Sequence, residues 1–338
     1  MIISQLAIFA IAFFILAWAS KILISSLTRI AQFLRMSEYA ASFILMGIAT
    51  SVPELFLAVS SGAGGVGELS FGNVIGANIL NVTLLIGLIA VIGKGIKARP
   101  SVQNSTSTVF LVSILPFVLI HDGLLDWIDG FLLIIVYIWY LSRLIKRKHE
   151  LEQDNSFKLE GDVTHKSEEE EVKYRVTKGL PLYGPSRINV FKQVFSFLGA
   201  LILLLGSSFL IINTAQGIAE NLHIELVVFG MFIIAFGTTI PELVFGVRSV
   251  MLNHDEMTVG NALGSLVVNS TLVLGIAAVI SPIQIIFSRS LVFSIIFLGV
   301  AIWTLKVFLR GDKIAITQKE GFALISIYVI FFILSRLL

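Results

Sequence analysis

The sequence predicts an all-α polytopic membrane protein with about ten transmembrane helices, arranged as two inverted repeats of five helices each. Three observations predict this fold. The chain is 56% hydrophobic with a mean hydropathy of +0.93, apolar runs recur along nearly its whole length, and one pair of polar motifs occurs twice. Charged residues make up only 14% of the 338 residues, far fewer than in a typical soluble domain.

Apolar runs of about 20 residues, the length that crosses a bilayer as a helix, set the number of spans. The first run is too long for the apolar core of a signal peptide and lacks a small-residue cleavage pattern, so we expect it to be a span. Pro116 interrupts the fourth run. The predicted spans are 3–26, 38–61, 69–92, 105–121, 124–142, 192–214, 223–249, 258–280, 286–308 and 319–336.

The basic residues predict the orientation of these spans. The loops that join spans 1–2, 3–4, 5–6, 7–8 and 9–10 hold 22 of the 24 Lys and Arg residues, and only Arg289 and Arg336 fall on the other side. Basic residues accumulate on the cytoplasmic face of membrane proteins. We therefore expect a protein of the cell (plasma) membrane with both termini outside.

Residues 143–191 form the one hydrophilic stretch, which includes the acidic run "SEEEE" at 167–171. Such a composition is typical of a solvated linker, and the orientation places it in the cytoplasm. It separates a first repeat, residues 1–142, from a second repeat, residues 192–338.

An internal repeat relates the two halves. When the chain is shifted by 188 residues, 50–92 aligns with 238–280 without a gap, and 17 of the 43 positions are identical. Because each half has an odd number of spans, the second half enters the membrane from the opposite face. Inverted repeats of this kind are typical of secondary transporters, whose binding site lies near the middle of the membrane.

The first repeated motif combines a proline with a glutamate inside an apolar span: "GIATSVPEL" at 47–55 and "AFGTTIPEL" at 235–243. Pro53 and Pro241 each remove a backbone donor and predict a kink or break in the helix. Glu54 and Glu242 are the only acids deep inside predicted spans. An ionised carboxylate there costs at least a few kcal/mol. With no Lys or Arg at the same depth, a proton or a metal cation must neutralise each one.

The second repeated motif supplies small and amide residues: "GNVIGANILN" at 72–81 and "GNALGSLVVN" at 260–269. Glycines four residues apart predict close packing of helices. The polar groups of both motifs are oxygen donors, which favour Ca²⁺ over Mg²⁺, because Ca²⁺ accepts about six to eight oxygens in adaptable geometry. The chain has no Cys and the motifs have no His, which disfavours zinc or copper.

The two motif pairs resemble the α-repeats of the Ca²⁺/cation antiporter superfamily, most closely those of its prokaryotic Na⁺/Ca²⁺ exchangers. The resemblance implies Ca²⁺ and Na⁺ as transported ions, with ligands on the second and third helices of each half. In the first half these are the Gly47 carbonyl, Thr50, Ser51, Glu54 and Asn81. In the second half they are the Ala235 carbonyl, Thr238, Thr239, Glu242, Ser265 and Asn269.

Two positions depart from the family pattern. Ala77 stands where many members carry a hydroxyl like that of Ser265, and Asn269 stands where many prokaryotic members carry Asp. The site would then have two carboxylates rather than three. Two coupling ions stay open: Na⁺, or H⁺ carried by Glu54 and Glu242.

Other classes of protein fit less well. An intramembrane enzyme is disfavoured because the sequence has no H-E-x-x-H zinc motif and no paired Asp within its spans. A channel is disfavoured by two symmetric, occluded half-sites. We expect the lipid bilayer as the environment, and no cofactor, nucleic acid or obligate protein partner.

Overall fold

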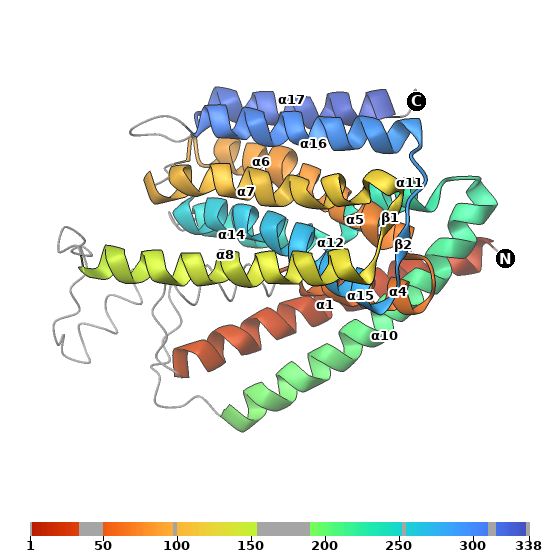
Figure 1. Cartoon of the computed structure of the whole chain (residues 1–338). Helices are drawn as coiled ribbons and strands as arrows, with labels where there is room; N and C mark the ends of the chain where they lie inside the picture. The colour runs from red at the N-terminus through yellow and green to blue at the C-terminus, as the bar shows by residue number, and fades with distance from the viewer. Residues whose placement is uncertain are drawn as a thin grey trace.

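The computed structural model describes residues 2–33, 50–96, 100–153, 190–251, 255–309 and 316–335. Nearly all of them are helical, and the helices run roughly along one common axis (Figure 1). Three of the predicted spans are composite, because a π-helical segment (η2, η5 or η6) interrupts the α-helix.

The helices of the first half are α1 (Ile2–Phe33), α4 (Val52–Ala63), α5 (Gly67–Leu80), η2 (Asn81–Leu85), α6 (Ile86–Ile92), α7 (Pro100–Leu119), the short η3 (Ile120–Asp122) and α8 (Trp127–Gln153). Those of the second half are α10 (Val190–Leu222), α11 (Leu226–Phe229), η5 (Gly230–Ile234), α12 (Ala235–Thr238), α13 (Ile240–Met251), α14 (Asp255–Val268), η6 (Asn269–Val273), α15 (Leu274–Ile280), α16 (Arg289–Phe308) and α17 (Gln318–Ser335). Each predicted span therefore corresponds to helix, although only the second part of span 38–61 lies in the described residues.

The helices that border the linker extend beyond the predicted spans. Helix α8 continues to Gln153 and α10 begins at Val190, so the hydrophilic stretch 143–191 starts within a helix. The predicted boundary followed hydrophobicity, which ends where the bilayer ends, whereas helical hydrogen bonding continues into polar sequence. The N-terminal end of α1 and the C-terminal end of α17 lie at one end of the molecule, opposite the C-terminal end of α8 and the N-terminal end of α10 (Figure 1).

The first helix of each half packs against its counterpart. Helices α1 and α10 pack together on one side of the molecule (Figure 1), through apolar side chains that include Leu16 and Leu204. Of the most apolar 18 residues of either helix 33% are buried, compared with 78% in the spans Gly67–Ile92 and Thr258–Ile280. The third and eighth spans therefore form the centre of the protein, and α1 and α10 lie at its surface with exposed apolar side chains such as Phe14 and Ile202.

Glycines bring the central helices into close contact. A Cβ on Gly72 or Gly76 would overlap the main-chain carbonyls of Val227 and Met231, so α5 lies directly against α11 and η5. Only small residues permit such an approach between membrane helices. This contact places the third span beside the seventh, which carries the second proline–glutamate motif.

The packing repeats between the halves, as inverted repeats require. A Cβ on Gly87 would lie 2.8 Å from the carbonyl oxygen of Gly321 in α17, and one on Gly275 would lie 2.8 Å from that of Gly130 in α8. Gly87 and Gly275 are counterparts under the 188-residue shift. Short antiparallel pairings also join the two halves where the chain turns between helices. Ile96 pairs with Ile316, and β1 (Leu124–Leu125) pairs with β2 (Ile283–Gln284).

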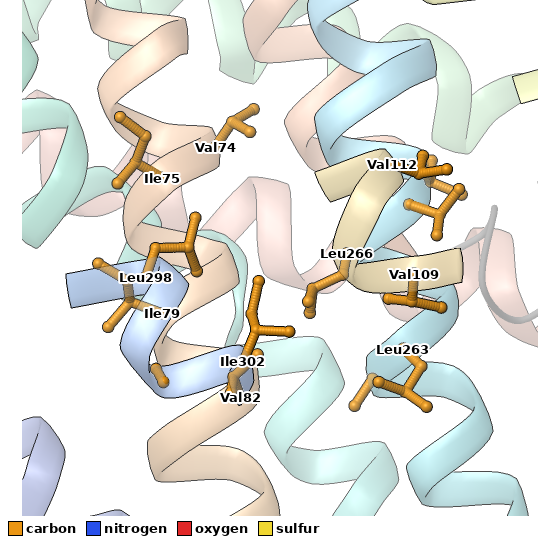
Figure 2. Packing of buried hydrophobic residues seen from close by; sticks show 14 of the residues in the cluster. Val74, Ile75, Ile79, Val82, Val109, Val112, Leu263, Leu266, Leu298 and Ile302 are labelled. Carbon is orange, nitrogen blue, oxygen red and sulfur yellow. The ribbon is translucent and has the colours of Figure 1, made fainter. Parts of the chain in front are cut away.

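The apolar core lies between these central spans. Figure 2 shows part of it, with side chains from the third and eighth spans and from α7 and α16 packed together, among them Val82 and Leu266.

Candidate cation site

The prolines interrupt their helices as the sequence predicts. Helix α12 ends at Thr238, and α13 begins at Ile240, one residue before Pro241. In the first half Pro53 lies in the first turn of α4. Gly47, the carbonyl ligand implied for this half, lies outside the described residues.

Two buried carboxylates follow the breaks. Glu54 lies in the first turn of α4 and Glu242 in the first turn of α13, and both are 0% exposed. The positive end of each helix dipole therefore points toward its glutamate. No carboxylate oxygen of either residue has a hydrogen-bond partner in the described part of the chain. Both negative charges are buried away from water, so bound positive charge is needed to stabilise them.

Threonine and asparagine pairs connect the two halves around these carboxylates. The Oγ1 atom of Thr50 donates to Oδ1 of Asn261 across 3.2 Å, and Oγ1 of Thr238 donates to Oδ1 of Asn73 across 3.2 Å. The two bonds are equivalent under the repeat. The threonine of each half therefore donates a hydrogen bond to the third helix of the other half.

One further contact is present in only one half. Thr50 Oγ1 also lies 3.2 Å from the hydroxyl of Ser265, whereas the counterpart position is Ala77. Thr238 instead shares its one hydroxyl hydrogen between Asn73 Oδ1 and the carbonyl oxygen of Ala235, which lies 3.2 Å from Oγ1.

The residue two positions before each proline, Ser51 in the first half and Thr239 in the second, also differs in its hydrogen bonds. Thr239 donates from Oγ1 to the carbonyl of Ala235 across 2.8 Å and from its backbone N–H to the same carbonyl across 3.0 Å. With the bond from Thr238, this carbonyl accepts three hydrogen bonds, and it would have to exchange some of them for an ion. The hydroxyl of Ser51, the counterpart of Thr239, is buried and has no partner in the described residues.

Asn81 and Asn269 occupy equivalent places in the repeat, each at the first residue of a π-helical segment. Such segments are frequent at functional sites, because the extra residue re-aims a side chain. Both residues are 0% exposed. Among the described residues, neither amide atom of Asn81 has a partner, and Oδ1 of Asn269 has none.

The structure adds two polar residues that the sequence analysis missed. Asn78 Nδ2 donates to Ser270 Oγ across 2.8 Å, and Asn78 Oδ1 accepts from Asn269 Nδ2 across 3.4 Å. The repeat did not reveal them because their counterparts are Leu266 and Val82. The signal was an unmatched Asn within an otherwise apolar span.

The donor set that results is limited to two carboxylates and neutral oxygens. No group of three or more His, Cys, Asp or Glu side chains that could hold a metal occurs within the ranges the structure describes.

A family comparison tests which proteins share this arrangement. The family model described as "Sodium/calcium exchanger protein" matches residues 4–146 and 192–337, on both sides of the linker.

The chain belongs to the sodium/calcium exchanger family.

Similar proteins agree with this family. The sodium/calcium exchanger MaX1 of Methanosarcina acetivorans is 25% identical over 334 residues, which cover 93% of each chain. The uncharacterized membrane protein MJ0091 of Methanocaldococcus jannaschii is 28% identical over 265 residues, 78% of each chain. The inner membrane protein YrbG of Escherichia coli K12 is 26% identical over 242 residues, 71% of this chain and 69% of its own.

The fold has a solved counterpart. A structure of the sodium-calcium exchanger NCX_Mj superposes with a TM-score of 0.63 at 24% identity and covers 98% of both chains. The exchanger described here is therefore a polytopic membrane protein of the Ca²⁺/cation antiporter superfamily, and its family consists of transporters, not enzymes.

Proposed function

We propose that this exchanger moves Ca²⁺ and Na⁺ in opposite directions across the cell membrane, through one shared site that opens to each side in turn. The observation that carries the proposal is the pair of buried carboxylates, Glu54 and Glu242, without hydrogen-bond partners in the described residues. Their two negative charges balance one Ca²⁺ or two Na⁺. The ions would thus compete for one site, as antiport requires.

The surrounding oxygens suit these ions. Hydroxyl and amide oxygens of both halves lie next to the carboxylates, and Ca²⁺ tolerates irregular oxygen shells. We propose as ligands Thr50, Ser51, Glu54, Asn81, Thr238, Thr239, Glu242, Ser265 and Asn269, with the carbonyls of Gly47 and Ala235.

Alternating access follows from charge and burial. Both glutamates are 0% exposed, so an ion must enter through a conformational change. Without bound cations the closed site would hold two like charges in a low dielectric, which is unfavourable. With cations bound, closure costs less, so loaded transporters change sides and empty ones do not. This coupling prevents a leak.

Ca²⁺ uptake into proteoliposomes tests the proposal. An opposing Na⁺ gradient is expected to drive uptake by the parent protein, and Glu54→Gln and Glu242→Gln are each expected to abolish it. Removing one partner of a buried charge pair costs about 3–5 kcal/mol, which corresponds to a loss of affinity of roughly 10²- to 10³-fold or more. Glu220→Gln, an exposed glutamate on α10, is the matched control and should transport normally. Near-normal transport by either buried variant would contradict the shared-carboxylate site.

H⁺/Ca²⁺ antiport is the second candidate, because Ala77 adds no hydroxyl and Asn269 adds no third carboxylate. Glu54 and Glu242 would then carry the protons. A pH gradient imposed without a Na⁺ gradient distinguishes the two. We further propose that both termini face outside and the linker faces the cytoplasm, as the basic loops indicate.

A further inference from the structure

A buried chain of hydrogen bonds connects α5 of the first half to η6 of the second. It runs from Asn269 Nδ2 to Asn78 Oδ1 (3.4 Å) and from Asn78 Nδ2 to Ser270 Oγ (2.8 Å). All three residues are 0% exposed. We propose that Asn78 is a positioning residue, which holds the amide of Asn269 so that its oxygen, and not its NH₂ group, faces the transported cation. The inference rests on the proposed cation site.

The need for positioning follows from the chemistry of the amide. A carboxylate presents an oxygen whichever way it turns, whereas an amide has an acceptor at one end and a donor at the other. An NH₂ group directed at a cation repels it. Because Asn78 Oδ1 accepts from Asn269 Nδ2, the donor end of Asn269 is held, and Oδ1 is the end without a partner in the described residues.

Ser270 completes the arrangement by accepting from Asn78 Nδ2. That bond uses the donor end of Asn78 and leaves its Oδ1 directed at Asn269. A buried amide that turned over would lose these bonds without water to replace them, which leaves buried polar groups unsatisfied and is unfavourable. This series of hydrogen bonds therefore favours one orientation of both amides.

The described residues of the other half contain no equivalent arrangement. The counterparts of Asn78 and Ser270 are Leu266 and Val82, which belong to the apolar core (Figure 2). Neither amide atom of Asn81 has a partner in the described residues. The two half-sites thus differ: the amide of Asn269 is oriented before an ion arrives, and that of Asn81 is oriented by the ion.

A double-mutant cycle tests this role, with Ca²⁺ binding to the purified exchanger in detergent as the measurement. Asn78→Leu introduces the residue that the repeat carries at the equivalent buried position, with the same branched arrangement of four side-chain heavy atoms but a larger volume. It is expected to weaken Ca²⁺ binding about tenfold, the factor carried by about 1.4 kcal/mol. In the Asn269→Asp background the same substitution should change Ca²⁺ binding less than about twofold, because a carboxylate needs no orientation.

A packing role for Asn78 makes the opposite prediction. If Asn78→Leu weakens Ca²⁺ binding equally in both backgrounds, or in neither, the positioning role is refuted. Should Asn78→Leu not fold, Ser270→Ala takes its place: we expect a loss of several-fold with Asn269 and almost none in the Asn269→Asp background, and equal effects would again refute the role. A folded parent protein that binds no Ca²⁺ would instead overturn the proposed function, and this inference with it.

Discussion

Replacing Ala77 with Ser is expected to strengthen the competition of Na⁺ against Ca²⁺. In the opposite half-site Thr50 contacts the hydroxyl of Ser265 at 3.2 Å. At the equivalent place Thr238 instead contacts its own helix, through the Ala235 carbonyl. A hydroxyl at position 77 would offer Thr238 the missing partner and add an oxygen to the site. It would also allow Thr238 to release the Ala235 carbonyl, which already accepts three hydrogen bonds.

One added oxygen is a modest change. By analogy with an ordinary net hydrogen bond it contributes about 1 kcal/mol, which corresponds to about a fivefold change in affinity. Ala77 is 0% exposed and packs with Leu80 and Ala235, so the extra atom must be accommodated in a tight region. Overpacking costs typically about 1–3 kcal/mol of folding stability. This cost appears in the melting temperature and can be separated from the ion competition.

The assay is Ca²⁺ uptake into proteoliposomes with increasing Na⁺ on the side of the Ca²⁺. The Na⁺ concentration that halves uptake should fall about fivefold in Ala77→Ser and rise by a similar factor in Ser265→Ala. Melting temperatures in detergent control for packing. If neither variant shifts this concentration, or the two shift it in the wrong directions, the hydroxyl is not a Na⁺ ligand. If Na⁺ gradients drive no uptake in the parent while pH gradients do, Glu54 and Glu242 carry protons instead.

Three further substitutions test the packing, the ligands and the orientation. Gly76→Ala is expected to lower the melting temperature strongly, since its Cβ would overlap a carbonyl of η5, whereas Gly206→Ala on α10, with nothing within 4 Å of its Cβ, should leave it unchanged. Asn81→Ala should weaken Ca²⁺ binding more than Asn73→Ala, because Asn81 has no partner in the described residues while the Asn73 oxygen already accepts from a threonine; an equal loss would show that Asn73 also ligates. Ser156→Cys, in the linker and outside the described residues, should resist an impermeant thiol reagent added to intact cells, and labelling would reverse the proposed orientation.

Much of the site could be predicted from the sequence, because the relevant costs belong to single residues. A glutamate inside an apolar span is costly wherever the span packs, and a proline interrupts a helix through its own ring. Glu54 and Glu242 are accordingly buried, and the helix is interrupted beside Pro241. The repeat then selected residues present in both halves, which include both partners of the bonds from Thr50 to Asn261 and from Thr238 to Asn73.

Residues without a counterpart could not be found in this way. Asn78 and Ser270 contact each other across 192 positions of sequence, and the repeat gives no reason to pair them. The bonds that the Ala235 carbonyl accepts from the hydroxyls of Thr238 and Thr239 were likewise not predictable, because they depend on the rotamers of the two threonines. The extension of α8 to Gln153 was missed because hydropathy reports where a chain leaves the bilayer and not where its helix ends.

The sequence by itself predicted a polytopic membrane protein with two inverted halves and two buried acids, because hydrophobic length, residue identity and internal similarity are local properties. Only the tertiary structure decided which oxygens remain without partners around those acids. Hydrogen bonding in a buried site is a competition among all neighbours, and those neighbours come from helices of both halves. That competition leaves the carboxylates, Ser51 and Asn81 without partners in the described residues, while it occupies Thr239 and holds the Asn269 amide through Asn78.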